Sequence, residues 1–367
     1  MRILIIEVNW LGDVLFSTPA IKALRERFPE SHIACLIVPR VKEVLANNPY
    51  IDELMINDCD GVHKGWLGKL RLIRELREKK FDMAVLFHRS FTRAALTFWA
   101  GIPRRVGYST WKRRFLLTDR APMPKKDSLH RVEHYLGIAA ALGCDIQDTL
   151  YEFFTAEDDE RYIKKMLQDE GVVSGDVIVC LNPGGNWFPK RWPKEYFSRL
   201  ADRLIDECKV KVILSGAYSD INLVREIAGG MKNKPIITAG KTTLQQSAAL
   251  FKASDVVVSA DSGPLHIAAG VGANVVGLFG PTSALITGPR GKGKIKLIQK
   301  DTSALGAPRL RREASLRENP AWTQGCTAPC YDEKCNDNRC MQAITVQEVF
   351  AAVKELLPVR KENGCKK

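Results

Sequence analysis

Residues 255–270 read DVVVSADSGPLHIAAG, and this stretch decides the fold. Its first part is a continuous apolar run, which predicts a buried strand of a parallel sheet, and small residues then predict a helix. In open α/β sheets such junctions bind ligands, and the N–H groups that begin a helix favour an anion such as a diphosphate. An ordinary helix cap is the competing interpretation. A carboxylate, a hydroxyl, a glycine and an imidazole stand at the junction: Asp261, Ser262, Gly263 and His266.

The same alternation of strand and helix runs through the whole chain. The first helix is expected to have Pro19 in its first turn and to end at Arg27. The pattern predicts two doubly wound α/β domains with parallel sheets, at 1–165 and 170–345, which face each other across a cleft. A last helix within 345–358 is expected to pack back on the first domain. The strands expected from apolar runs are 3–8, 32–38, 54–56, 83–87, 177–181, 210–214, 256–259 and 275–279.

The bulk composition is that of a globular protein. Of 367 residues, 45% are hydrophobic and 26% are charged, and no apolar run is long enough for a transmembrane helix. The first residues read as a strand rather than a signal peptide, so we expect a cytoplasmic protein.

The net charge of +13 is unevenly distributed. Residues 61–115 contain 14 lysines and arginines against three acidic residues, which gives this segment a net charge of +11. Such a field attracts nucleic acid, anionic lipid or an acidic sugar, although residues 67–80 alone are also typical of a solvated helix face. The aromatic interleaving typical of single-stranded nucleic-acid platforms is weak here, so no nucleic-acid partner is expected.

Polar turns follow several of the predicted strands. Asn9–Asp13 reads NWLGD after the first strand; it lacks the dinucleotide fingerprint GxGxxG, which argues against a dehydrogenase. Asp13 is either a helix cap or a general base. Further turns follow three strands of the second half and predict a site for a nucleotide with its diphosphate. Their candidate residues are Gly184, Gly185, Asn186, Lys190, Gly216, Asp220, Lys241 and Thr242.

Ten cysteines are present, and four of them cluster near the end of the chain. The usual CxxC knuckle of a zinc site is missing, so reduced packing thiols, a structural metal site and disulfides stay open. The clustered residues are Cys326, Cys330, Cys335 and Cys340.

Several of these motifs together resemble one family over nearly the whole chain. NWLGDVLFSTPAIKALRERFP, NPGGNWFPKRWP, GKTTLQQSAALFKASDVVVSADSGPLHIAAGVG and VVGLFGPTS are similar to the ADP-heptose–lipopolysaccharide heptosyltransferases of glycosyltransferase family 9. Trp10 and the cysteine-rich tail resemble heptosyltransferase II more than I. The resemblance implies a GT-B fold, with the acceptor in the first domain and the donor in the second.

The resemblance also implies an activity. It is the inverting transfer of heptose from ADP-L-glycero-D-manno-heptose to the lipopolysaccharide inner core, without a cofactor or catalytic metal. Asp13 would be the base, Lys190 would bind the diphosphate and Asp261 the heptose hydroxyls. Asp220 stands in a turn that departs from the family's Gly-Gly-Pro-x-Glu, and Glu7 stands where many relatives carry a basic residue, which is expected to change the charge around Asp13.

The basic segment 61–115 would then face an anionic acceptor and the inner-membrane surface, which makes the protein peripheral to that membrane. A related GT-B transferase that uses another nucleotide sugar, and a non-enzymatic polyanion-binding protein, are the alternatives. The expected acceptor-binding residues are Lys64, Arg89, Arg93, Arg113 and Arg114.

Overall fold

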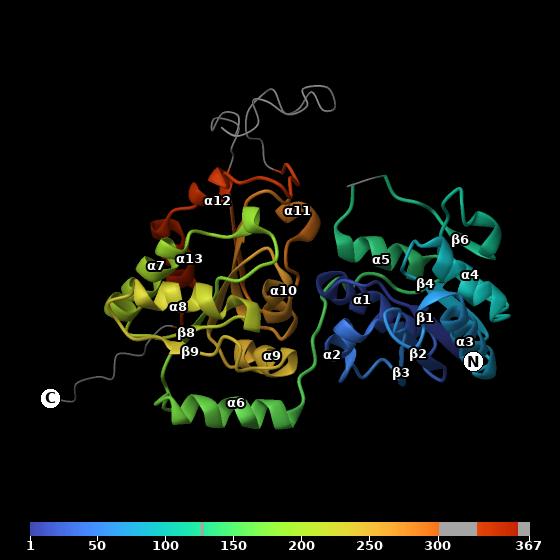
Figure 1. Ribbon diagram of the computed structural model, residues 1–367, viewed down its shortest axis with the longest axis horizontal. Coiled ribbons are helices and arrows are strands. Elements are labelled where there is room, and N and C mark those ends of the chain that lie inside the picture. The colour runs from blue at the N-terminus through green and yellow to red at the C-terminus, as the bar shows by residue number, and fades with distance from the viewer. Residues whose placement is uncertain (126–127, 301–328, 359–367) are drawn as a thin grey trace, which may run out of the picture. The chain divides into compact units, whose positions relative to one another are not determined.

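The computed structural model describes residues 1–125, 128–300 and 329–358. The chain divides into two compact units, Met1–Ala156 and a second unit that begins at Glu157 (Figure 1). The boundary therefore precedes helix α6 (Glu157–Asp169), whereas the sequence analysis ended the first domain at residue 165, within this helix. The reason is packing, because α6 lies against α9 (Leu244–Lys252) of the second unit and buries Ile163 and Leu167.

The N-terminal unit is built on a parallel six-stranded sheet with the order β3-β2-β1-β4-β5-β6. This is the Rossmann order, in which the direction of winding reverses between the first and fourth strands. Residues such as Ile3 to Ile6 are buried on both faces of the sheet, as a continuous apolar run predicts. The strands are β1 (Arg2–Ile6), β2 (His32–Ile37), β3 (Glu53–Ile56), β4 (Met83–Leu86), β5 (Arg104–Tyr108) and β6 (Asp119–Ala121).

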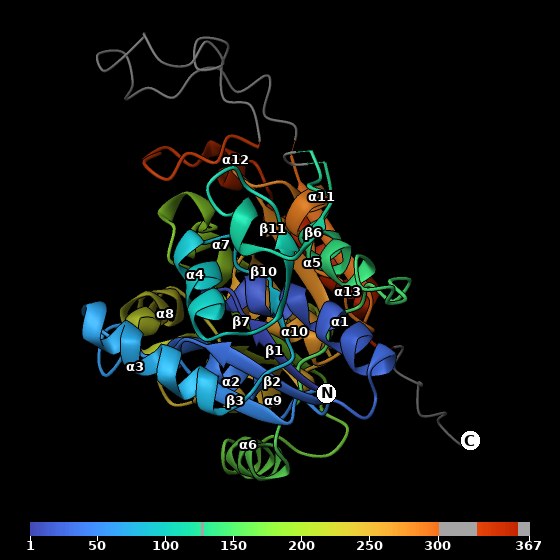
Figure 2. The same ribbon diagram turned by 90° about the vertical axis from the view of Figure 1, so that its right-hand side faces the viewer.

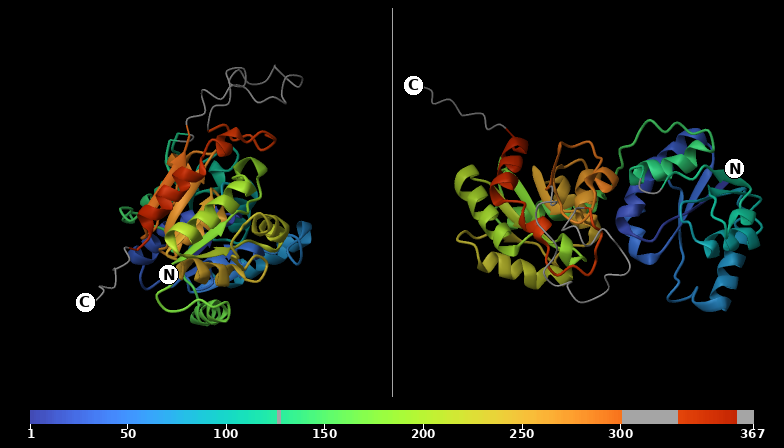
Figure 3. Two further views of the ribbon diagram at one scale, coloured as in Figure 1. Left: turned by 90° about the vertical axis from the view of Figure 1, so that its left-hand side faces the viewer. Right: turned by 90° about the horizontal axis from the view of Figure 1, so that it is seen from above.

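Helices cover both faces of this sheet. Leu4 and Ile6 share a core with α3 and α4, while α1 and α5 pack together on the opposite face (Figure 3). The helices are α1 (Leu11–Arg27), α2 (Lys42–Leu45), α3 (Gly65–Glu78), α4 (Phe91–Trp99) and α5 (Arg131–Ala140), with short 3₁₀ turns η1 (Pro39–Val41) and η2 (Arg114–Leu116).

Helix α1 begins eight residues earlier than Pro19, so the expectation that Pro19 stands in its first turn is wrong. A proline inside a helix cannot donate to the carbonyl four residues before it, here that of Leu15. The Thr18 hydroxyl donates to the Leu15 carbonyl at 2.9 Å and replaces the missing bond. The longer helix matters because its first turn carries Asp13.

The C-terminal unit repeats the same topology. Its parallel sheet has the order β12-β11-β10-β7-β8-β9, so winding reverses between β7 and β10, where Val258 pairs with Leu181. The strands are β7 (Ile178–Asn182), β8 (Lys211–Leu214), β9 (Ile236–Ile237), β10 (Val256–Ala260), β11 (Asn274–Phe279) and β12 (Ile295–Gln299).

The last helix of the described chain, α13 (Val346–Leu356), packs within this unit. Val349 and Val353 join one core cluster with Leu181 and with α7, and α13 contacts α7 and strands β10 to β12. Its apolar face is therefore used in the C-terminal core, and the expected packing on the first domain stays a prediction. No helix of the described residues is long and apolar enough to cross a bilayer. The remaining elements are α7 (Lys194–Cys208), α8 (Ile221–Gly229), α10 (Gly263–Gly270), α11 (Ala284–Thr287) and α12 (Arg339–Gln342), with η3 (Phe188–Lys190) and η4 (Tyr218–Asp220).

Candidate active site

A cavity of about 260 Å³ lies at the carboxyl edge of the N-terminal sheet, where winding reverses. Val8 and Asn9 line it after β1, and residues 87–89 line it after β4. Asp13, in the first turn of α1, faces this cavity, and α5 closes it from the other side. Two strand ends and two helices thus bring a carboxylate to the position where such sheets bind ligands.

The Asp13 carboxylate is half-buried and oriented by Tyr135. The Tyr135 hydroxyl donates to Asp13 Oδ1 at 3.4 Å. Burial, together with the charge of Asp13, raises the pKa of Tyr135 well above its usual range, so this phenol keeps its proton at neutral pH. Because Tyr135 comes from α5, far along the chain, no local sequence pattern around Asp13 indicates it.

Glu7 is a second carboxyl group near this cavity, with 1% of its surface exposed. Burial raises its pKa from 4.5 to about 8, even though Ser17 and the Val8 N–H lower it. The contacts of Ser17 are consistent with a protonated Glu7. Ser17 Oγ lies 2.8 Å from Glu7 Oε1 and 2.7 Å from the Val14 carbonyl oxygen. The Ser17 hydroxyl has only one proton, so it can donate to only one of these two oxygens. Both contacts are hydrogen bonds when Glu7 is protonated and donates to Ser17. Glu7 is thus mostly neutral at pH 7 and adds little negative charge beside Asp13.

The positive charge of the cavity comes from arginines. Arg89 and Arg131 line it together with His88 and His134. Burial and the charges of the two arginines lower the pKa of His134 to about 4, and burial with neighbouring arginines also lowers the pKa of His88. The imidazoles are therefore neutral at pH 7, while the guanidinium groups attract an anion. Of these residues the sequence identified only Arg89.

The other expected acceptor residues lie elsewhere. Lys64 and Arg114 are exposed but do not line this cavity, and Arg93 is buried with Nη2 3.4 Å from Asn9 Oδ1. Arg113 is wrong as an acceptor contact, because its side chain has no exposed surface. It donates from Nε to the Tyr108 carbonyl and from Nη1 to that of His88. It therefore ties together the segments that follow β4 and β5.

In the C-terminal unit, a partly buried ion pair lies at the corresponding point of the sheet. Lys190 Nζ donates to Asp261 Oδ2 at 2.8 Å and to the Asp261 carbonyl at 3.1 Å, which joins the turn after β7 to the turn after β10. Thr282 donates to the same carboxylate at 2.6 Å, and His266 Nε2 lies 3.4 Å from its other oxygen. Burial alone would raise the pKa of Asp261, but His266 and Lys190 outweigh it and hold that pKa well below its usual range.

Glycines shape the turns around this pair. An added Cβ at Gly184 would collide with the Asp220 carboxylate, and one at Gly216 would lie 2.9 Å from Asp220 Cβ. Asp220 Oδ2 accepts from the Ala217 N–H at 2.9 Å, so Asp220 braces the turns after β7 and β8. An added Cβ at Gly185 would meet no described atom within 4 Å, and Asn186 is exposed. The Gly185 backbone therefore leaves room for a ligand.

The remaining residues that the sequence predicts to bind the nucleotide sugar lie at the first turn of α10 and in the loop after β9. Gly263 begins α10, and in the described chain Ser262 makes no side-chain cap there; its Oγ lies 3.3 Å from Ser259 Oγ. N–H groups at such a helix start suit an anion. Lys241 is exposed, and the Thr242 and Ser247 hydroxyls lie 2.8 Å apart.

Comparison with known proteins decides the family. The sequence model of glycosyltransferase family 9 (heptosyltransferase) matches residues 69–315. The chain belongs to glycosyltransferase family 9. It is 30% identical over 302 residues to lipopolysaccharide heptosyltransferase 2 of Escherichia coli K12, a match that covers 79% of this chain and 85% of that protein.

Solved structures agree with this assignment. The E. coli ADP-heptose lipopolysaccharide heptosyltransferase II matches with a TM-score of 0.75 and 25% identity over 97% of this chain and 98% of that one. A family 9 transferase from Veillonella parvula matches with a TM-score of 0.82 and 24% identity over 97% and 96%. The predicted GT-B fold and family are confirmed, and the protein is a glycosyltransferase. The alternative of a non-enzymatic polyanion-binding protein is not supported.

Three of the four clustered cysteines of this glycosyltransferase are described, and Cys326 lies outside the described residues. Cys330 is exposed, Cys335 donates to the Asp337 carbonyl at 3.2 Å, and Cys340 is buried. Among the described residues, no three metal-ligating side chains gather as a metal site. Cys340 packs beside Gly280 next to Met341, which is the role of a small apolar side chain.

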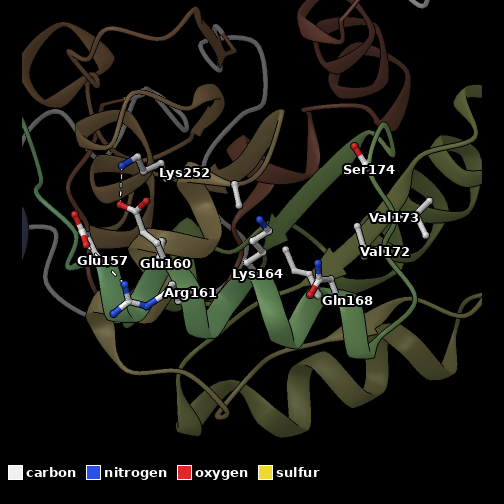
Figure 4. Close-up of a pocket in the computed structure, with 12 residues that line it drawn as sticks. Glu157, Glu160, Arg161, Lys164, Gln168, Val172, Val173, Ser174 and Lys252 are labelled. Carbon is white, nitrogen blue, oxygen red and sulfur yellow. Dashed lines mark hydrogen bonds and ion pairs between the residues drawn. The ribbon is translucent and has the colours of Figure 1, made fainter.

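A wider cavity of about 860 Å³ lies between α6 and α9 of the C-terminal unit (Figure 4). None of the predicted donor residues lines it. Some of its charged side chains are already paired: Lys252 donates to Glu160 at 2.7 Å, and Arg161 pairs with Asp158. This wider cavity is therefore not part of the candidate active site.

Proposed function

We propose that this protein transfers L-glycero-D-manno-heptose from its ADP derivative to a hydroxyl group of the lipopolysaccharide inner core. The N-terminal unit binds the acceptor and the C-terminal unit binds the donor. The observation that carries the proposal is Asp13, a carboxylate held by Tyr135 in a cavity lined by Arg89 and Arg131. A base beside fixed positive charge suits an acceptor that is both a hydroxyl donor and an anion.

In this reaction Asp13 takes the proton of the acceptor hydroxyl as its oxygen attacks the anomeric carbon. The bond between that carbon and the diphosphate oxygen breaks, and ADP leaves with the electron pair. A single displacement of this kind inverts the anomeric carbon. Glu7, which is mostly protonated at pH 7, adds little negative charge that would repel an anionic acceptor from this site.

The leaving diphosphate gains negative charge in the transition state. Lys190 and the first N–H groups of α10 are proposed to stabilise this charge, and no metal or cofactor is invoked. Asp261 holds the Lys190 ammonium in position and is proposed to contact the heptose hydroxyls. The remaining donor contacts are proposed at Gly184 to Asn186, Gly216, Asp220, Lys241, Thr242, Ser262 and His266.

A panel of nucleotide sugars, assayed on truncated lipopolysaccharide core acceptors with product detection, tests the proposal. ADP-heptose should give product with at least tenfold higher kcat/KM than other nucleotide sugars. A UDP- or GDP-sugar used equally well would instead favour the related GT-B transferase with another donor. We also propose that the enzyme works at the cytoplasmic face of the inner membrane, where its lipid-linked acceptor is made.

A further inference from the structure

Large apolar side chains are exposed at one end of the N-terminal unit. Trp111 keeps 80% and Trp66 keeps 70% of its surface exposed. A single exposed apolar residue needs no explanation, but several near one another indicate an interaction surface. We call this set the aromatic rim: Trp66, Leu67, Leu70, Phe91, Trp111 and Phe115.

Topology places these residues at the same edge of the sheet. In a parallel sheet the connecting helices run antiparallel to the strands, so they begin at the carboxyl edge. Trp66, Leu67 and Leu70 lie in the first two turns of α3, and Phe91 begins α4. The two helices lie side by side (Figure 2) and both end at the opposite edge, where Arg77 of α3 donates to the Trp99 carbonyl of α4.

The loop after β5 joins this edge through an aromatic contact. The rings of Phe115 and Phe91 lie with their centroids 6.3 Å apart, so the 111–115 segment packs beside the start of α4. The aromatic rim therefore lies along the carboxyl edge that also bears the Asp13 cavity, but it is not part of that cavity.

Positive charge surrounds the aromatic rim. Among the described residues, none of these basic side chains forms an ion pair, and all are exposed: Lys64, Lys69, Lys112 and Arg114. The two acidic residues of α3, Glu75 and Glu78, lie further along the helix and pair with Arg71 and Arg74. Exposed tryptophan and leucine with lysine and arginine around them is the composition of a surface that enters an anionic bilayer interface.

The positive charge around the aromatic rim also distinguishes between a second copy of the chain and a lipid bilayer as its binding partner. A second copy that presented the same surface would bring two sets of unpaired cations together, whereas anionic phospholipid would neutralise them. We propose that the aromatic rim docks this transferase on an anionic phospholipid bilayer, with Trp66, Leu67 and Trp111 entering the headgroup region. This inference rests on the proposed function only for its purpose, which is to bring the Asp13 edge to a lipid-linked acceptor.

Sedimentation of the full chain with vesicles tests the inference. Vesicles of phosphatidylethanolamine and phosphatidylglycerol should bind the protein, with weaker binding as salt rises, and vesicles of phosphatidylcholine alone should bind much less. Burying one large apolar side chain is worth roughly tenfold or more in an equilibrium constant. The triple variant Trp66→Ser, Leu67→Ser, Trp111→Ser should therefore lose at least about tenfold in vesicle binding.

Two matched controls test whether vesicle binding depends on the aromatic rim itself or on any exposed apolar or basic side chain. Leu285, 87% exposed on α11 of the C-terminal unit, supplies the apolar control, and Leu285→Ser should bind as the wild type does. Lys69→Ala with Lys112→Ala should weaken binding and reduce its salt dependence. Lys232→Ala with Lys234→Ala, on the exposed surface of the C-terminal unit, should do neither.

The outcome does not depend on the donor. Rim variants should keep wild-type turnover with a water-soluble truncated acceptor, and vesicle binding is measured without any nucleotide sugar. Each of three results would overturn the inference. The wild type does not bind anionic vesicles, the triple variant binds them as well as the wild type does, or the wild type binds phosphatidylcholine vesicles equally well. The inference is also wrong if the triple variant converts a dimer to a monomer in analytical ultracentrifugation, because a second copy would then cover the rim.

Discussion

Replacing Glu7 by glutamine should change how stability depends on pH. In the folded protein burial raises the pKa of Glu7 from 4.5 to about 8, so between these values the folded state keeps a proton that the unfolded chain releases. Stability is therefore full below about pH 4.5 and is lost as pH rises toward 8. At 1.36 kcal/mol for each pH unit, the whole loss is about 5 kcal/mol, of which about 3 kcal/mol is already present at pH 7.

The Glu7→Gln variant should not lose stability in this way as pH rises, and the hydrogen bonds of the site should be kept. The glutamine amide can donate to Ser17 Oγ where protonated Glu7 does, and its carbonyl can accept from the Val8 N–H, as Glu7 Oε2 does at 3.0 Å. Glu7→Gln should therefore unfold like the wild type near pH 4.5 and become progressively more stable than the wild type toward pH 9.

Hydrogen exchange of β1 and β4 peptides across a urea series, at pH 5, 7 and 9, measures the free energy of opening this unit. Glu53→Gln is the control of opposite sign, because its pairing with Lys79 lowers the pKa of Glu53 and gives stability that is lost as pH falls. Its effect should be small, since Glu53 is partly exposed. Parallel pH profiles for wild type and Glu7→Gln would refute a protonated, buried Glu7.

Further outcomes follow from the two sites. Lys190→Ala should weaken ADP binding by roughly tenfold or more, as loss of a charge-assisted hydrogen bond does, and more than Asp261→Ala, which removes one contact of the ammonium but keeps its charge; calorimetry showing the reverse order would reject this division. Arg89→Met should raise the acceptor KM and flatten its salt dependence without changing the melting temperature or donor KM. Arg113→Met should instead lower the melting temperature, because it leaves the buried Tyr108 and His88 carbonyls without donors; an unchanged melting temperature would contradict this structural role.

Much of the architecture could be read from the sequence because it depends on local patterns. Continuous apolar runs identified β1, β7 and β10, and the residues just after them necessarily meet at the edge where winding reverses. The edge strands β6 and β12 were not predicted from the sequence. Their sequences, DRA and IKLIQ, lack a continuous apolar run and are partly exposed.

What the sequence could not reveal depends on tertiary contacts. Arg113 stands in a basic run and looks like a surface cation, but backbone carbonyls from two other segments make its burial favourable. Arg131, His134 and Tyr135 reach the Asp13 cavity only because α5 packs on α1. Thr282 joins Asp261 from the turn after β11, although the motif that contains it was already part of the family resemblance.

Single-turnover kinetics of Asp13→Asn, with ADP-heptose and a truncated core acceptor, test the central claim most directly. The amide keeps the shape of Asp13 and its contact with Tyr135 but cannot take a proton, so the rate should fall by roughly 10² to 10⁴-fold. ADP binding by calorimetry should be unchanged, because Asp13 belongs to the N-terminal unit. Turnover close to that of the wild type would show that Asp13 is not the base.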